Sequence, residues 1–345
     1  DPLMYAVCTA AVPATLGPDA VAGELVLLTE AHPADAFRPV YSPDGRWLVY
    51  GIRRELDFYA DRQRIVAFDR QGGTHTCLTE DWDVMNASEW AFVPGTTTVV
   101  FTAEREARGA LFALDIAAAV ADPAVRTPWE IARGGWIGAP HPAGDRLFAT
   151  LDALDHPPEV GSWARDGSDR RMVTDFTGAG LADLALGTVE DVTFAGAGGD
   201  AVQMFLVHPP DVAAGGDAAV AGATKPTGGG EARTRRDDPL PLVHLIHGGP
   251  HGTFGDSWHW RWNAQAFAAA GYMVARVNFH GSTGWGQAFT ASILGRWGDQ
   301  PFDDIMAATD TLVARGLADP ARMAAAGGSY GGYLVAWIAG HTDRF

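Results

Sequence analysis

Residues 323–333 read Met-Ala-Ala-Ala-Gly-Gly-Ser-Tyr-Gly-Gly-Tyr, a short apolar run followed by a serine set between glycines. The apolar run is typical of a short strand, and the residues after the serine have the composition of a helix. A serine on a sharp strand-to-helix turn is held in a strained backbone conformation, so Gly327 and Gly331, two positions away, must lack side chains. The stretch therefore predicts a nucleophile elbow with Ser329 as the attacking residue.

A second glycine-rich segment, His247-Gly-Gly-Pro-His-Gly252, directly follows the apolar stretch 242–246. Acyl transfer builds negative charge on a carbonyl oxygen, and two preorganised backbone N–H groups can stabilise that charge. We expect one N–H from Tyr330 and the other from Gly249, with His247 and Gly248 in the supporting loop. One alternative is a plain glycine turn. Another is a pair of metal-binding histidines, but no third ligand follows at a zinc spacing, so no metal is expected.

Strand-like and helix-like runs alternate through the second half of the chain, in the order 242–246, 258–270, 272–277, 302–313 and 323–326. This alternation predicts a doubly wound, mostly parallel sheet with helices on both faces. With the elbow, it indicates the N-terminal part of an α/β-hydrolase domain over residues 186–345. Residues 213–238 are rich in Gly, Ala and Thr, and we expect them to form a flexible surface insertion.

The first half shows a repeat of about 50 residues. Turns that contain Pro43, Pro94 and Pro142 lie 51 and 48 residues apart (94−43 and 142−94), and each precedes a β-rich run. A second mark, Leu-Thr-Glu, occurs at 28–30 and again at 78–80. Such a period predicts the blades of a β-propeller, of which residues 1–185 would form three to four, a partial ring. The alternative is an irregular β-sandwich.

The charge composition excludes some classes of partner. The chain has 25 Lys and Arg against 42 Asp and Glu, a net charge of -17. A surface this acidic repels phosphate backbones and anionic lipids, so we expect no nucleic-acid partner and no membrane partner. No cofactor is expected, and a homo-oligomer is possible. The two cysteines, Cys8 and Cys77, cannot form a disulfide framework, which favours a reducing compartment such as the cytoplasm.

The general base is the element that the sequence does not supply. In this fold the chain order is serine, then acid, then histidine, after further strands. His341 and Asp343 lie on or just past the helix that begins at the serine, so they cannot fold back onto its hydroxyl. His259 and His280 precede the serine, and His280 is expected to be a loop residue near the cleft. We therefore expect the acid and the base beyond residue 345, further blades before Asp1, and no activity from this chain alone.

The joint pattern resembles the prolyl oligopeptidase family of serine peptidases. The motifs that carry the resemblance are HGGPHG (247–252), VNFHGSTGWGQAF (277–289), GRWGDQPFDDI (295–305) and GGSYGGY (327–333), preceded by the propeller-like repeat. Residues 255–272 are most similar to the acylaminoacyl-peptidase and dipeptidyl-peptidase V branch. The resemblance implies a peptidase that is truncated here at both ends and whose propeller admits short peptides to the cleft. It also implies Ser329 as nucleophile and Gly249 and Tyr330 as oxyanion donors.

The sequence departs from the family pattern at His280, a position where many relatives have arginine. Two other functions fit parts of the pattern. A carboxylesterase of the α/β-hydrolase class shares the elbow and the glycine loop, although such esterases usually carry a helical lid. A non-catalytic propeller–hydrolase binding protein would lack the triad.

Overall fold

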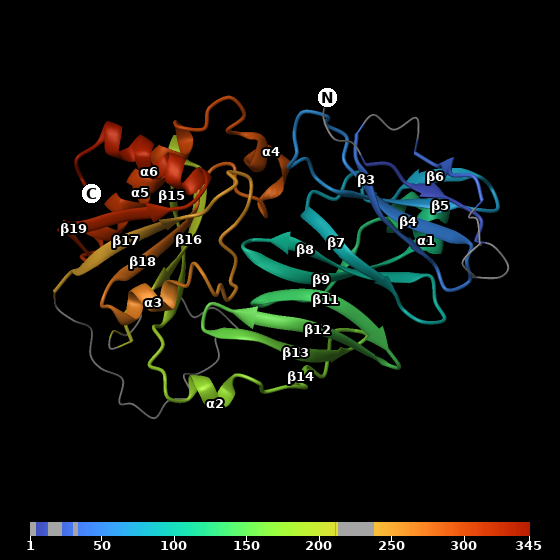
Figure 1. Ribbon diagram of the computed structural model, residues 1–345, viewed down its shortest axis with the longest axis horizontal. Helices are drawn as coiled ribbons and strands as arrows, with labels where there is room; N and C mark the ends of the chain where they lie inside the picture. The colour runs from blue at the N-terminus through green and yellow to red at the C-terminus, as the bar shows by residue number, and fades with distance from the viewer. Residues whose placement is uncertain (1–4, 13–22, 30–33, 211, 213–237) are drawn as a thin grey trace.

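The computed structural model describes residues 5–12, 23–29, 34–210, 212 and 238–345. A β-rich half and an α/β half lie side by side in it (Figure 1). The surface insertion expected over 213–238 lies outside the described residues, except for Asp238.

Strands in the described part of the first half form three antiparallel units of four. The second and third units are joined into one eight-stranded sheet by a single parallel pairing, Trp136 with Gly109. The first unit is β3 (Ala36–Tyr41), β4 (Trp47–Ile52), β5 (Arg64–Asp69) and β6 (Thr74–Cys77). The second is β7 (Met85–Phe92), β8 (Thr98–Arg105), β9 (Arg108–Asp115) and β10 (Trp129–Ala132). The third is β11 (Trp136–Ala143), β12 (Arg146–Ala153), β13 (His156–Ala164) and β14 (Arg171–Met172).

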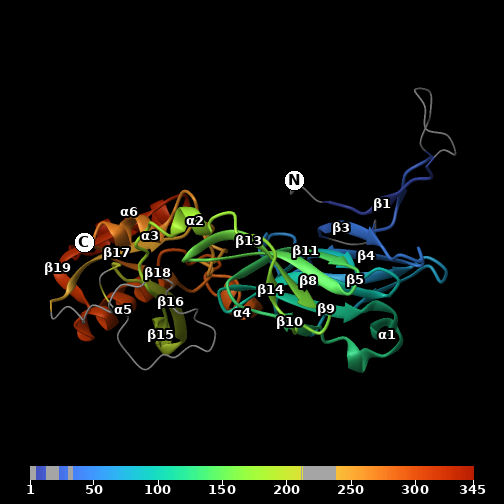
Figure 2. The same ribbon diagram turned by 90° about the horizontal axis from the view of Figure 1, so that it is seen from below.

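Shorter elements complete this half. Strands β1 (Cys8–Thr9) and β2 (Val26–Leu27) form a separate antiparallel pair. The second unit carries α1 (Ile116–Ala121) and the 3₁₀ turn η1 (Pro123–Val125), and α2 (Gly178–Leu181) follows the third. In Figure 2, seen from below, β3, β4 and β5 lie below β1 in the view, with β8, β9 and β11 beside them.

Equivalent features recur in the three units. The turns at Pro43 and Pro94, and the turn that follows Pro142 at the end of β11, connect the first strand of each unit to its second. Each first strand also has an exposed non-glycine residue with positive φ, namely Arg38 (φ 52), Glu89 (φ 54) and Ala139 (φ 47). These residues lie 51 and 50 positions apart (89−38 and 139−89), at irregularities in the pairing of the first strand with the second. The sequence period therefore corresponds to one four-stranded unit.

Five strands of the α/β half form one sheet in the order β15-β16-β18-β17-β19. Their bounds are β15 (Val189–Ala195), β16 (Ala201–Val207), β17 (Leu240–Ile246), β18 (Met273–Asn278) and β19 (Ala318–Gly327). Strand β17 is parallel to β18 and β19, but β16 is antiparallel to both β15 and β18. The expectation of a mostly parallel sheet is wrong for these pairings. Only the 3₁₀ turn η2 (Ala197–Gly199) and its flanks connect β15 to β16, and such a short link permits only a hairpin.

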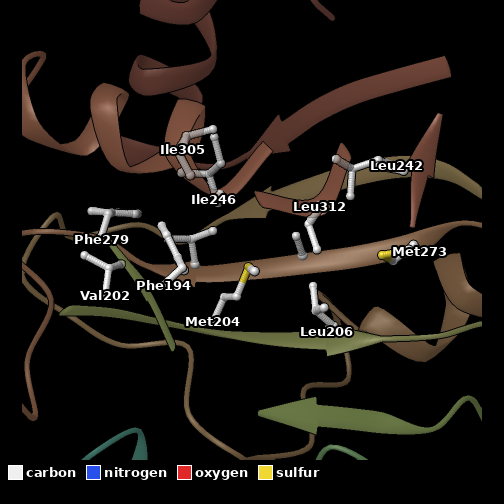
Figure 3. Close-up of a cluster of buried hydrophobic side chains, with 14 of the residues drawn as sticks. Phe194, Val202, Met204, Leu206, Leu242, Ile246, Met273, Phe279, Ile305 and Leu312 are labelled. Atoms are coloured by element: carbon white, nitrogen blue, oxygen red, sulfur yellow. The ribbon is translucent and has the colours of Figure 1, made fainter. Parts of the chain in front are cut away.

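Helices cover both faces of this sheet (Figure 1). They are α3 (Ala264–Ala269) on one face, and α5 (Gln300–Ala314) and α6 (Tyr330–His341) on the other, with the short α4 (Gly286–Ala291) beside the first half. The core between the sheet and α5–α6 contains Met204, Leu242, Met273 and Leu312, each with 0% of its surface exposed (Figure 3). Val207 and Val274 pack on the opposite face with Ala268 of α3.

The helix expected at 258–270 is shorter than its composition indicates. Trp258 to Trp262 form an irregular loop, and α3 begins only after Asn263, whose side chain accepts a hydrogen bond from Gln265 N–H (2.8 Å). The loop is stabilised by His259, because its Nδ1 accepts from the backbone N–H groups of Arg261 (3.1 Å) and Trp262 (2.9 Å). A side chain that satisfies these amides competes with the helix for them.

Two aspartate side chains, one from each half, accept hydrogen bonds from backbone N–H groups of the other half. Trp258 N–H donates to Asp152 of β12 (2.6 Å), and Leu154 N–H donates to Asp256 of the α/β half (3.1 Å). In addition, the side chain of Gln287 donates to Asp61 (3.0 Å). The two halves are therefore joined by hydrogen bonds at several separate points. Among the described residues, the helices are too short or too polar to cross a lipid bilayer.

Candidate active site

Ser329 occupies the sharp turn between β19 and α6. Its backbone has φ 56 and ψ -125, a region that costs a non-glycine residue about 1–3 kcal/mol. The side chain is exposed, while the next residue, Tyr330, is buried. The serine is therefore held in a strained conformation that presents its hydroxyl to solvent instead of packing it.

The glycines on each side leave no room for a side chain. A Cβ atom on Gly327 would lie 2.7 Å from the carbonyl carbon of Gly331 and 2.8 Å from the carbonyl oxygen of Ile246. A Cβ on Gly331 would overlap that same oxygen and lie 3.1 Å from the carbonyl oxygen of His247. The turn therefore packs backbone against backbone at the end of β17, which is possible only with glycine at both positions.

The glycine loop 247–252 lies directly beside the serine. Strands β17 and β19 are parallel neighbours, and Ile246 pairs with Gly327, so the segments that follow them leave the same edge of the sheet. A Cβ placed on Gly248 would be 3.3 Å from Ser329 Cβ and 3.8 Å from its Oγ. The backbone of the loop is thus close enough to interact with an atom bound to that hydroxyl.

His247 fixes the orientation of a peptide group in this loop. The ring is buried, and its Nδ1 is 2.8 Å from the carbonyl oxygen of Gly248 while its Nε2 is 2.9 Å from Ser282 Oγ. A carbonyl oxygen only accepts, so Nδ1 carries the proton and Nε2 accepts from the Ser282 hydroxyl. Burial lowers the pKa of His247 to about 4, which keeps the ring neutral and this pattern unchanged near neutral pH.

The hydrogen bond of His247 determines where the next amide points. The carbonyl of Gly248 and the N–H of Gly249 belong to one trans peptide, and in such a peptide the two groups point in opposite directions. Holding the carbonyl toward His247 therefore holds the Gly249 N–H away from it. This support through Ser282 was not predicted from the sequence, because residues 247 and 282 belong to separate motifs.

Tyr330 follows Ser329 and has its backbone N–H at the start of α6. It is the first residue of α6, where backbone N–H groups have no partner within the helix. Its hydroxyl donates to the carbonyl oxygen of Trp297 (2.6 Å), and its ring packs against Phe279 and Tyr333. Burial raises the pKa of Tyr330, so the phenol is a neutral structural group and the amide is the part available to a ligand.

The indole ring of Trp262 lies next to the residue that precedes the serine. A Cβ on Gly328 would lie 2.8 Å from the six-membered ring of Trp262, so this ring is in contact with the residue that precedes Ser329. Trp262 lies in the loop that His259 stabilises. A ligand bound at the serine would thus be next to an indole surface.

The described histidines do not supply a base for Ser329. His251 donates from Nδ1 to the carbonyl oxygen of Gly281 (3.0 Å) and contacts the ring of Tyr59 from the first half. His341 is eleven residues along α6, about 16 Å from the elbow at 1.5 Å per residue, and bonds to Trp337 O (2.7 Å). His280 lies in the turn after β18, where it is buried between two carboxylates.

Metal binding has no support in the described part of the chain, where His, Cys, Asp and Glu do not gather in groups of three or more that could hold an ion. Instead, the arrangement brings together an exposed serine hydroxyl, a helix N-terminus and a glycine loop with one peptide held in place. Such an arrangement can bind an electrophilic carbonyl and stabilise the oxyanion formed by attack of the serine.

Comparisons with family models and with curated proteins both find similarity to one family of peptidases. Residues 258–345 match the model described as the prolyl oligopeptidase family. The probable dipeptidyl-peptidase 5 of Emericella nidulans is 30% identical over 323 residues, which cover 90% of this chain and 40% of that protein. The dipeptidyl-peptidase 5 of Schizosaccharomyces pombe is 26% identical over 306 residues, 88% of this chain and 40% of that protein. The chain thus spans about 40% of the length of these curated relatives.

Solved structures share the fold at lower identity. An acylaminoacyl peptidase in complex with Z-Gly-Gly-Phe-chloromethyl ketone superposes with a TM-score of 0.72 at 23% identity and covers 94% of this chain and 45% of its own. The Mycobacterium tuberculosis puromycin-hydrolyzing peptidase gives a TM-score of 0.65 at 20% identity, covering 100% of this chain and 48% of its own. These likenesses concern the arrangement of the whole chain, including both halves.

Proposed function

We propose that this chain, which is similar to the prolyl oligopeptidase family, belongs to that family and carries the nucleophile and the glycine loop 247–252, here called the oxyanion loop, of a serine peptidase that cleaves short peptides. The names of the relatives support peptide substrates. They include dipeptidyl-peptidases, and one structural neighbour holds a peptide chloromethyl ketone. An esterase or a binding protein is less well supported, since neither is among those names.

One observation supports the proposal most directly, namely the exposed Ser329 at positive φ, with Gly248 so near that a Cβ on it would be 3.3 Å from Ser329 Cβ. In the proposed reaction Ser329 Oγ attacks the scissile carbonyl, and the amine leaves as the acyl-enzyme forms. The N–H groups of Gly249 and Tyr330 stabilise the oxyanion, and losing one such donor costs about 3 kcal/mol of transition-state stabilisation. The proton acceptor that this step needs is not among the described histidines.

We further propose that the three four-stranded units are consecutive blades of a β-propeller, with a boundary to the hydrolase domain near residue 185. Links between successive first strands support this proposal. Trp90 Nε1 donates to Arg38 O (2.8 Å) and Ala139 N–H donates to Glu89 Oε2 (2.7 Å), so the three strands are adjacent in chain order. In addition, Thr29 and Thr79 accept equivalent bonds from Val7 N–H (2.9 Å) and Ile65 N–H (2.8 Å), one period apart.

The test compares two substrates on the product of the complete reading frame. A peptidyl anilide and a nitrophenyl ester of the same acyl group are assayed in parallel, with Ser329→Ala as the control. We expect anilide turnover that the variant loses, together with covalent labelling of Ser329 by a fluorophosphonate. Cleavage of the ester without the anilide would reject the peptidase in favour of an esterase, and absence of both would favour a binding protein.

A further inference from the structure

His280 is buried between carboxylates from two different elements. Its backbone N–H (2.6 Å) and its Nδ1 (2.8 Å) both face Oδ2 of Asp304 on α5. Its Nε2 is 3.2 Å from Oδ2 of Asp200, at the start of β16. Asp304 has 0% of its side chain exposed and Asp200 has 70%, so His280 connects the interior of the domain to its surface.

This geometry fixes the protonation state of the ring. An ionised carboxylate only accepts hydrogen bonds, so a nitrogen that bonds to one must carry a proton. Neutral imidazole has a single N–H and can satisfy only one of the two carboxylates, whereas imidazolium satisfies both. Burial lowers the pKa of His280, but the hydrogen bonds and charges of Asp304 and Asp200 outweigh it and leave that pKa raised.

No other charged group replaces either carboxylate in the described surroundings of the ring. The ring of Phe289 on α4 lies 4.7 Å from it, centroid to centroid, and carries no charge. Asp304 also accepts from Ala197 N–H (2.8 Å) and affects the phenol of Tyr330 on α6 electrostatically, so its own position is well determined. If His280 lost one proton, the N–H that remained would stay on Nδ1 and bond to Asp304. The hydrogen bond from Nε2 to the exposed Asp200 would therefore be lost first.

Residues 281–283, which directly follow His280, are bonded to the oxyanion loop, residues 247–252. Three hydrogen bonds connect residues 281–283 to residues 247–252. Ser282 Oγ donates to His247 Nε2 (2.9 Å), His251 Nδ1 donates to the carbonyl oxygen of Gly281 (3.0 Å), and Thr283 N–H donates to the carbonyl oxygen of Gly252 (2.9 Å). A shift of this segment would reach the loop that orients the Gly249 amide.

We propose that His280 is a positioning residue whose imidazolium form holds residues 279–283, and through them the oxyanion loop, in place. This role in catalysis rests on the function proposed above. It predicts that catalysis is lost as pH rises through the His280 titration, whereas a base of the Ser-His-Asp kind becomes active in that direction. The loss should appear in kcat with little change in KM, because oxyanion contacts strengthen in the transition state.

The experiment measures kcat and KM from pH 6 to 10 on the product of the complete reading frame. The variants are His280→Arg, which keeps a cation at every pH, and Asp200→Asn, which removes only the exposed carboxylate. The matched control is His156→Gln, which removes a second carboxylate-bound histidine, paired with Asp155 (2.8 Å) and distant in sequence from the oxyanion loop. We expect a fall in wild-type kcat on the order of tenfold above the titration.

The variants should change this fall in different ways. It should disappear in His280→Arg, move to lower pH in Asp200→Asn and persist in His156→Gln. An alkaline limb that is the same in wild type and Asp200→Asn would overturn the proposal. Should His280→Arg fail to fold, Asp200→Asn decides alone.

Stability provides a readout that does not need activity. A raised pKa in the folded state contributes stability that is present below the ordinary value near 6.5 and is lost as pH rises through the folded value. The urea midpoint of the 345-residue chain should fall over this range in wild type, and the fall should occur at lower pH in Asp200→Asn. If the protein had no peptidase activity but showed this difference, the proposed function would fail, and the inference that protonated His280 holds residues 279–283 would stand. Identical midpoint profiles would reject that inference.

Discussion

The packing at the elbow gives a prediction that needs no substrate. In Gly331→Ala the new Cβ would overlap the carbonyl oxygen of Ile246 and lie 3.0 Å from its carbonyl carbon. Both atoms are backbone atoms at the end of β17, so they cannot rotate away as a side chain could. Overpacking of this kind costs about 1–3 kcal/mol, and the better helix propensity of alanine returns up to about 1 kcal/mol. We expect Gly331→Ala to lower the free energy of unfolding by a net amount of about 1–2 kcal/mol.

The neighbouring glycine provides a matched control. A Cβ on Gly332 would be 3.5 Å from Gly327 O, an ordinary van der Waals contact, and the residue lies on the same helix. Gly332→Ala should therefore stabilise the chain by about 0.4–1 kcal/mol. The assay is urea unfolding of the 345-residue chain followed by circular dichroism. Equal or reversed midpoints for the two variants would show that the turn does not pack backbone against backbone as described.

Three further predictions use the same chain. Ser329→Gly should raise the free energy of unfolding by up to about 2 kcal/mol, because glycine tolerates φ 56, whereas Ser329→Ala should not; equal midpoints for the two would contradict the strain. Burial raises the pKa of Asp152 to about 6. The folded state therefore binds a proton more tightly than the unfolded state, and the free energy of unfolding falls as pH rises from about 4 to 6. Asp152→Asn should be more stable than wild type above pH 6, by at most about 3 kcal/mol, and similar to it near pH 4. The isolated chain should not react with a fluorophosphonate above the rate of Ser329→Ala, since the described histidines do not reach Ser329; rapid labelling would show that one of its residues acts as a base.

Local patterns predicted the elements around the elbow well. The serine, its glycines and the apolar run before it are contiguous, so their arrangement follows from one strand, one turn and one helix. The 50-residue period likewise corresponds to a four-stranded unit, because each unit needs the same turn between its first two strands. In both cases the information lies within a few residues of the feature that it specifies.

Predictions failed where the hydrogen bonds of a single side chain, local in one case and distant in the other, decide the conformation. The helix expected from Trp258 begins only at Ala264, because the side chain of His259 satisfies amides that a helix would have used. Similarly, His280 was expected to be a loop residue near the cleft, and its bonds to two carboxylates were not predicted. Its burial depends on Asp304 and Asp200, which are 24 and 80 residues away, and neither spacing is readable as a motif.

The loop between β17 and α3 explains how the first half affects the candidate site. It begins with His247 beside Ser329, and it returns at Trp262 to contact Gly328. Between these points, its middle part is bonded to the first half by Asp152 and Asp256. A segment held at both ends by the site and at its centre by the first half cannot move independently of that half. Displacement of β12 would therefore be transmitted to the indole beside the serine and to the peptide that His247 orients. The first half thus contributes to the geometry of the site.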